Sequence, residues 1–126
     1  MSNQRSAPVF LNLFRIRFPV AAVTSIAHRI SGVLLFLFFP FLVWLLDLSL
    51  QGPDGYARAL ALLQPLWVRL GLALIGWSLL HHLLSGIRFL LIDIDVGVSL
   101  GAARRTAWAV NIIGVLLGLA CLWWLL

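Results

Sequence analysis

The sequence predicts an all-α integral membrane protein with three transmembrane helices, and three observations lead to this fold class. Of the 126 residues, 63% are hydrophobic and 10% are charged, whereas soluble domains are about 45–50% apolar. Three apolar stretches follow one another, and each approaches or exceeds the roughly 20 residues that cross a bilayer as a helix. Because lipid offers the backbone no hydrogen-bond partners, these stretches form helices rather than open strands.

The apolar stretches place the elements of a single membrane-anchor domain that covers residues 1–126. Residues 1–23 are expected to form a cytoplasmic N-terminal segment, and the three helices are expected at about 25–48, 66–92 and 106–126. The connector between the first two helices contains QGPDGY, which indicates a turn. The N-terminal segment is basic and amphipathic, so we expect it to lie on lipid headgroups.

The basic residues are nine arginines, and their distribution predicts the orientation of the chain. In a three-helix topology seven of them lie on one side, and only Arg58 and Arg69 lie on the other. The positive-inside rule then places the N-terminus in the cytoplasm and the C-terminus in the periplasm. Because the arginines flank the apolar stretches, nucleic-acid binding is not expected. Arg15, Arg17 and Pro19 interrupt the run that a signal peptide would need, so a multi-pass protein of the bacterial inner membrane is the simplest interpretation.

The first helix opens with SIAHRISG, which contains the first candidate site. Ser25 and Arg29 are four residues apart, and Ser25 and His28 are three apart, so one turn presents a hydroxyl, an imidazole and a guanidinium. Ionisable groups inside a membrane are costly and are candidates for function. The alternative is that Arg29 reaches to the headgroups and that Ser25 bonds back to a carbonyl of its own helix.

The second helix ends with HHLLSGIR, which contains the second candidate site. His82 precedes Asp93 by eleven residues, which places it about 16 Å from that helix end, near the middle of the bilayer. An imidazole there either hydrogen-bonds to a neighbouring helix or binds haem iron as an axial ligand. Gly86 on the same face would leave room for a flat macrocycle, and His28 would pair with its propionates. His81 lies about 100° around the helix, and for it we favour packing between helices.

The third helix carries a pair of glycines, Gly114 and Gly118, with three residues between them. Small residues at this spacing let helix backbones approach closely, either within the domain or against another subunit. The one cysteine, Cys121, has no partner for an internal disulfide and is interpreted as a thiol within the membrane.

Two longer motifs contain the candidate sites. RFPVAAVTSIAHRISGVLLF contains S-x-x-H-R-[IV]-[ST]-G, and HHLLSGIRFLLID contains H-x-x-x-G-I-R-x-L-x-x-D. In this order, and in so short a chain, they resemble the signatures of the large cytochrome b subunit of succinate dehydrogenase, the membrane anchor of succinate:quinone oxidoreductase. The resemblance covers most of the chain, and the three-helix plan agrees with it.

The resemblance implies roles for five residues and no catalytic residue. His82 matches the axial ligand of haem iron, because it is the histidine four residues before the glycine of G-I-R. His28 matches a position near the haem propionates, and Arg88 would give cofactor binding electrostatic support. Ser25 and Arg29 match positions that line the quinone pocket.

The resemblance also implies the cofactors and partners of the chain. Haem b would be shared with a second small membrane anchor subunit that supplies the other axial ligand, and ubiquinone would be the substrate. In respiratory complex II, a flavoprotein subunit oxidises succinate in the tricarboxylic acid cycle. An iron–sulfur subunit, on which the N-terminal segment would also dock, passes the electrons on for aerobic electron transport. This chain is therefore expected to be non-catalytic alone.

Two other interpretations stay open at this point. The first is a fumarate reductase anchor, because the direction of electron flow depends on the potentials of the quinone and the cofactors. The second is a small membrane transporter or structural subunit without a cofactor, because three helices and a few polar residues would suffice. The second interpretation predicts neither haem absorption nor quinone-dependent activity.

Overall fold

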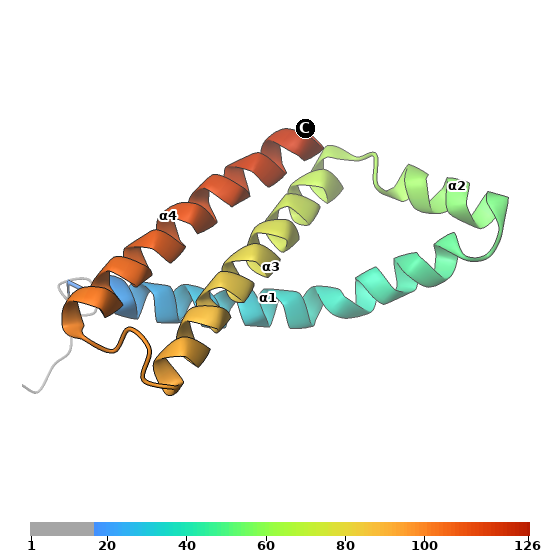
Figure 1. Cartoon of the computed structure of the whole chain (residues 1–126). Helices are drawn as coiled ribbons and strands as arrows, with labels where there is room; N and C mark the ends of the chain where they lie inside the picture. The colour runs from blue at the N-terminus through green and yellow to red at the C-terminus, as the bar shows by residue number, and fades with distance from the viewer. Residues whose placement is uncertain (1–16) are drawn as a thin grey trace, which may run out of the picture.

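The computed structural model describes residues 17–126, which form four α-helices and contain no strand (Figure 1). The helices are α1 (Val20–Ser49), α2 (Pro53–Leu62), α3 (Leu66–Asp93) and α4 (Leu100–Leu125). Helices α1, α3 and α4 are long and apolar enough to cross a membrane. The predicted all-α fold with three membrane-spanning helices is confirmed.

The chain buries small and polar side chains and exposes its large apolar ones. The largest of the fully buried side chains all carry a hydroxyl group: Thr24, Ser31, Ser78 and Ser85. Large side chains such as Phe36 and Leu37 point outward along α1. In a soluble protein such a surface would aggregate. In lipid, close packing of small and polar residues holds helices together while large apolar residues face the acyl chains.

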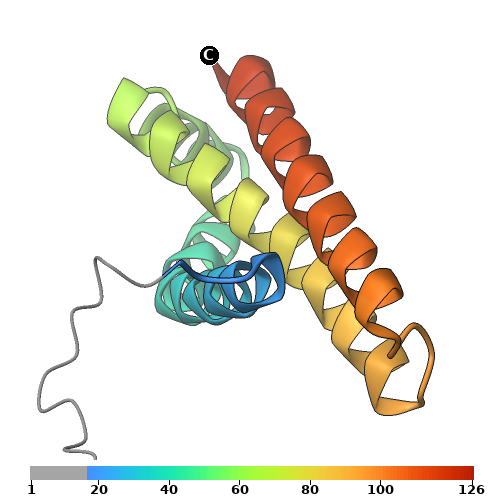
Figure 2. The same cartoon turned by 90° about the vertical axis from the view of Figure 1, so that its left-hand side faces the viewer.

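Helices α3 and α4 form an antiparallel pair, and α1 crosses them near the end where α4 begins (Figures 1 and 2). Thr24 near the start of α1 donates a hydrogen bond to Asn111 Oδ1 of α4 at 3.1 Å. The first turns of α1 and α4 and the last turns of α3 therefore lie at one end of the bundle. Four of the five exposed tryptophans lie toward the other end, namely Trp44, Trp67, Trp123 and Trp124, whereas Trp108 lies near the start of α4.

The pair of glycines in α4 packs within the chain, which was one of the two predicted alternatives. A Cβ on Gly114 would lie 2.7 Å from His81 Cδ2, and a Cβ on Gly118 would lie 2.7 Å from Trp77 Cδ1. Each glycine therefore receives an aromatic ring of α3, and the two helices approach closely along this seam.

Two helices begin earlier than the sequence predicted. Helix α1 begins at Val20 rather than at about 25, because Pro19 is in an extended conformation (φ −63°, ψ 151°) directly before the first turn. Helix α4 begins at Leu100 rather than at about 106, because the Ser99 hydroxyl accepts a hydrogen bond from the Ala102 amide. The predictions followed the apolar stretches, and both helices extend beyond them. Residues 20–23 of the N-terminal segment predicted at 1–23 therefore belong to α1, and residues 1–16 lie outside the described part.

Helix α2 was missed by the sequence analysis, which assigned this region to a connector with a turn. The turn is present at Gly52, whose φ is 91°. Pro53 then begins the helix and Asp54 lies in its first turn, and both are favourable helix-start residues. Gly55 packs against the carbonyl of Leu48 with no room for a Cβ, so α2 folds back onto the end of α1.

Candidate functional site

The candidate site lies where α1 crosses α3. The His28 and His82 rings come from segments 54 residues apart, and they stack with centroids 4.1 Å apart and planes 13° apart. The Phe89 ring meets the His28 ring edge-on at 5.2 Å. The structure therefore brings together one histidine from each of the two motifs that the sequence analysis singled out.

Glycines on both helices allow this close approach. A Cβ on Gly32 would lie 3.0 Å from His82 Cε1, which is tighter than an ordinary contact, so Gly32 makes room for the His82 ring. A Cβ on Gly86 would lie 3.6 Å from His28 Nε2. The face of Gly86, which was interpreted as space for a macrocycle, is thus next to the His28 ring. Gly32 was not singled out from the sequence, although it shares a helical stripe with Ser25 and Arg29.

The hydrogen bonds of His82 fix which ring nitrogen carries the proton. Nδ1 lies 3.1 Å from the His28 carbonyl oxygen, and because a carbonyl can only accept, Nδ1 is the donor. Nε2 is then the unprotonated nitrogen, and it makes no hydrogen bond within residues 17–126. In that range the only buried side-chain nitrogen or oxygen without a partner is Ser78 Oγ, so His82 Nε2 is not enclosed. The half-buried His82 therefore has a lone pair on Nε2 that no residue of 17–126 uses.

Ser31 belongs to the same group of contacts. Its hydroxyl donates to the His28 carbonyl at 2.8 Å, and its Oγ lies 3.3 Å from His82 Nδ1. Ser31 is fully buried. The sequence analysis missed it, because only the crossing of α1 and α3 brings it to the ring.

The side chains of Ser25 and Arg29 on α1 are not held by hydrogen bonds to other described residues. Ser25 is half-buried and Arg29 is exposed, and neither side chain forms a hydrogen bond within the described residues. By contrast, Thr24 bonds back to the Val20 carbonyl at 3.0 Å and Ser31 bonds back to that of His28. The back-bond that would have explained Ser25 as an ordinary helix serine is therefore absent from this part of the chain.

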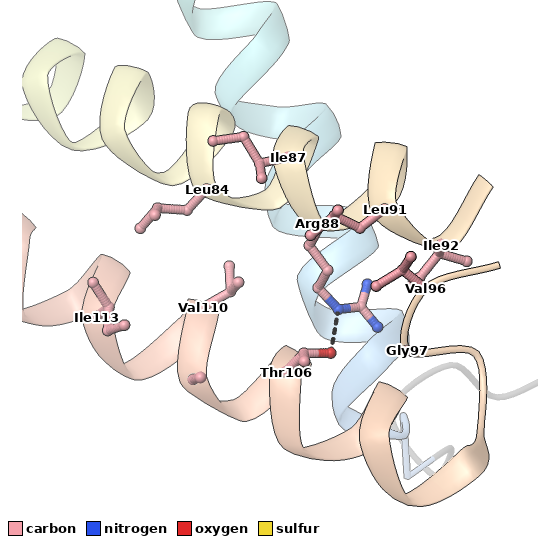
Figure 3. Close-up of a pocket in the computed structure, with 11 residues that line it drawn as sticks. Leu84, Ile87, Arg88, Leu91, Ile92, Val96, Gly97, Thr106, Val110 and Ile113 are labelled. Atoms are coloured by element: carbon pink, nitrogen blue, oxygen red, sulfur yellow. Dashed lines mark hydrogen bonds between the residues drawn. The ribbon is translucent and has the colours of Figure 1, made fainter. Parts of the chain in front are cut away.

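Arg88 points to α4 and not to the His28–His82 pair. Its Nε donates to Thr106 Oγ1 at 3.2 Å and its Nη2 to the Ala103 carbonyl at 3.1 Å. Arg88 as a whole is 7% exposed, and it borders a cavity of about 280 Å³ whose other walls are mainly apolar (Figure 3). Its Cζ lies 5.2 Å from the Phe89 ring centroid, so Phe89 separates it from His28.

His81 is enclosed between α3 and α4, as the sequence predicted for a packing residue. It is 3% exposed. Its Nδ1 lies 3.3 Å from Ser85 Oγ and its Nε2 lies 3.5 Å from Asn111 Oδ1. Both ring nitrogens are engaged, so His81 has no free lone pair for a ligand.

The donor set around His82 fits haem iron better than a bare metal ion. Residues 17–126 contain no group of three or more His, Cys, Asp or Glu side chains that could hold an ion. Haem supplies four of the six iron ligands itself, so one imidazole is enough from each side. A ligating imidazole usually donates its other N–H to a carbonyl or carboxylate, and His82 makes this bond to His28.

Fold and site together define a small multi-pass membrane protein that presents one unengaged imidazole nitrogen from a membrane-spanning helix. The chain belongs to the succinate dehydrogenase/fumarate reductase transmembrane subunit family, whose model matches residues 1–121.

Three relatives illustrate this similarity, and each is named a succinate dehydrogenase cytochrome b556 subunit. The protein from Coxiella burnetii is 34% identical over 92% of this chain and 94% of its own length. That from Rickettsia prowazekii is 33% identical over 91% of this chain and 88% of its own. That from Paracoccus denitrificans is 31% identical over 85% and 82%. The matches cover nearly the whole of each protein, so the family assignment does not depend on a single motif.

Proposed function

We propose that this chain is the cytochrome b membrane anchor of succinate dehydrogenase, and that it binds haem b and forms part of a ubiquinone-reduction site. The observation that carries the proposal is the hydrogen bonding of His82: Nδ1–H donates to the His28 carbonyl at 3.1 Å, and Nε2 has no hydrogen-bond partner within residues 17–126. The names of the relatives agree with this role.

His82 Nε2 is the proposed axial ligand of the haem iron, and haem b supplies one-electron redox capacity when bound. His28 is the proposed propionate partner, because neither ring nitrogen forms a hydrogen bond within residues 17–126 and the ring lies 4.1 Å from that of His82. Arg88 is engaged by α4, so its proposed support for the cofactor is the field of its positive charge and not a direct bond.

The second axial ligand is proposed to come from a second small membrane anchor subunit. The His28 and His82 rings stack face to face at 4.1 Å, so only one of the two would hold the iron. This excludes His28, and both nitrogens of His81 are engaged. The haem would therefore lie between this chain and its partner.

Ser25 and Arg29 are the proposed quinone contacts. A hydroxyl can donate a hydrogen bond to a quinone carbonyl, and a guanidinium stabilises negative charge that develops on a quinone oxygen during reduction. Both lie on the α1 stripe that continues to Gly32, the glycine in contact with His82. Because Arg29 is exposed, the remaining walls of the pocket are proposed to come from the membrane partner and the iron–sulfur subunit. That subunit would deliver electrons from a succinate-oxidising flavoprotein, so the chain would be non-catalytic alone.

The proposed location is the bacterial inner membrane, with the N-terminus in the cytoplasm. Within the described residues, five arginines lie at the end where α1 and α4 begin: Arg17, Arg29, Arg88, Arg104 and Arg105. Arg58 and Arg69 lie at the other end. The positive-inside rule supports this orientation.

A reduced-minus-oxidised spectrum of the complex tests the proposal. The chain is purified with its membrane partner as wild type, as His82→Ala and as the matched control His81→Ala. We expect a b-type signal in the wild type and in His81→Ala, and its loss in His82→Ala. A haem signal that persists in His82→Ala would remove the ligand assignment, and a wild-type complex without haem would favour the cofactor-free interpretation.

A fumarate reductase anchor is the second candidate, because the family contains transmembrane subunits of both enzymes. The direction is tested by comparing succinate oxidation with ubiquinone and fumarate reduction with a quinol in the same purified complex. Faster fumarate reduction would favour this alternative and would leave the assignment of His82 intact.

A further inference from the structure

Ser31 has two contacts that together distinguish it from the other buried serines. Its hydroxyl donates to the His28 carbonyl at 2.8 Å, a common bond for a helical serine. Its oxygen also lies 3.3 Å from Nδ1 of His82, on another helix. Because the Ser31 hydroxyl donates its proton to the His28 carbonyl, its Oγ can only accept a hydrogen bond from the Nδ1–H of His82. This N–H is therefore shared between two acceptors, the carbonyl oxygen and Ser31 Oγ.

The strength of that shared hydrogen bond affects the opposite nitrogen of the ring. When the N–H of an imidazole is bonded more strongly, the ring gains imidazolate character and its other nitrogen becomes more basic. Ser31 is fully buried, and hydrogen bonds are electrostatically stronger in such a low-dielectric environment. A more basic axial nitrogen favours the oxidised form of haem iron, so hydrogen bonding at Nδ1 lowers the haem potential.

We propose that Ser31 is a positioning residue for the haem ligand: its hydroxyl orients the His82 ring, keeps the proton on Nδ1 and thereby lowers the potential of the haem. This inference rests on the proposed role of His82 as the axial ligand. Ser31 would act on the haem through His82 and without touching the macrocycle.

Two other fully buried serines of α3 provide matched controls. Ser85 Oγ lies 3.3 Å from Nδ1 of His81, the histidine enclosed on the α4 side. Ser78 Oγ has no hydrogen-bond partner in the described part of the chain. All three serines lie within membrane-spanning helices, so Ser→Ala removes the same atom from a similar environment at each of them.

The test is a redox titration of the haem, with its absorption and electron paramagnetic resonance spectra, in the intact complex purified from wild type and each variant. Ser31→Ala is expected to shift the haem midpoint potential upward and to change the resonance of the oxidised haem, because one acceptor of the Nδ1–H is lost. Ser85→Ala and Ser78→Ala are expected to retain the wild-type potential and spectra. A shift of equal size in either control would overturn the assignment, since it would show a general effect of helix packing.

An unchanged potential and resonance in haem-loaded Ser31→Ala would also overturn the inference. If Ser31→Ala does not yield a complex, Ser31→Cys is titrated instead. A thiol has nearly the same shape and is a weak acceptor, so the same upward shift is expected and its absence counts equally against the inference. His82→Ala distinguishes a failure of the proposed haem ligand from a failure of the proposed role of Ser31. If it keeps the haem, the proposed ligand fails; if it loses the haem while Ser31 variants behave as wild type, only the role of Ser31 fails.

Discussion

The neighbouring histidines on two faces of α3 differ in how their ring nitrogens are hydrogen-bonded. On the α4 face, His81 is 3% exposed and both of its ring nitrogens are engaged, by Ser85 and Asn111. On the α1 face, His82 uses one nitrogen on a backbone carbonyl, and the other has no hydrogen-bond partner among residues 17–126. Burial in the membrane therefore does not by itself make a histidine a ligand. What matters is whether the packing leaves one nitrogen unengaged while it fixes the other.

The difference between the faces also appears in their glycines. Gly114 on the α4 side would bring a Cβ to 2.7 Å from the His81 ring, whereas Gly32 on the α1 side would bring it to 3.0 Å from the His82 ring. The α4 face is the tighter of the two, so substitutions there should affect assembly. Substitutions on the α1 face should affect the cofactor first.

The largest effect is expected from Gly114→Val. Its Cβ would overlap the His81 ring, which α3 holds in place, and overpacking of this kind costs about 3 kcal/mol of stability. Thermal unfolding of the purified complex measures the loss. Gly71→Val is the matched control, because no atom lies within 4 Å of a Cβ at Gly71. Equal stability of the two variants would contradict the close α3–α4 packing.

The next largest effect is expected from Arg29→Ala, which tests the proposed quinone contacts of α1. We expect a decrease of about 10- to 100-fold in kcat/KM for ubiquinone, because the loss of a positioned charge removes stabilisation of the reduced quinone oxygen. Reduction of an artificial dye by the soluble subunits should persist. Arg88→Ala is the comparison, since Arg88 is bonded to Thr106 and Ala103 and should affect stability instead. Unchanged quinone kinetics in Arg29→Ala would count against the proposed pocket.

Gly32→Ala is expected to weaken haem binding by about 10-fold, because displacement of a ligating imidazole typically reduces affinity by this amount. A shift of only a few tenths of an ångström relieves the contact at 3.0 Å, so the complex should still assemble. Haem per complex after dilution and gel filtration measures the change. Gly76→Ala provides the control, since its Cβ would approach Cys121 Sγ at 3.2 Å, away from His82. Equal haem retention in the two variants would contradict the role of Gly32.

The smallest effect is expected from Asn111→Leu, which removes the acceptor for Thr24 and the contact to His81. Hydrogen bonds between membrane helices contribute about 1 kcal/mol, so the unfolding temperature should fall slightly. The haem spectrum should stay as in wild type. A loss of haem as large as that of Gly32→Ala would show that the two faces of α3 are coupled.

Periodicity predicted a substantial part of this arrangement. The 100° step of a helix separated His81 from His82, and the structure places them against different helices. Hydropathy located the three long helices but not the starts of α1 and α4, which depend on Pro19 and Ser99. Their helix-start signals lie outside the apolar stretches, and a sequence analysis based on hydropathy alone passes over them.

The contacts between helices were not predictable from the sequence in the same way. Ser31 and Gly32 reach His82 only because α1 crosses α3 at this height, and the local sequence does not determine the crossing point. For the same reason the sequence, which predicted electrostatic support of the cofactor by Arg88, did not show that Arg88 bonds to Thr106 and Ala103 of α4. Periodicity assigns a residue to a face, whereas the neighbouring helix determines what that face meets.

The acceptor that fixes the His82 proton is a backbone atom, the carbonyl oxygen of His28. No substitution of the His28 side chain deletes this oxygen, so position 28 can vary in its chemistry toward the cofactor without releasing the ring of His82. The position of this oxygen depends instead on the path of α1. A substitution at residue 28 would therefore change the proposed contact to the propionates and leave the acceptor for Nδ1 in place, whereas a change that shifts the helix would displace the acceptor itself.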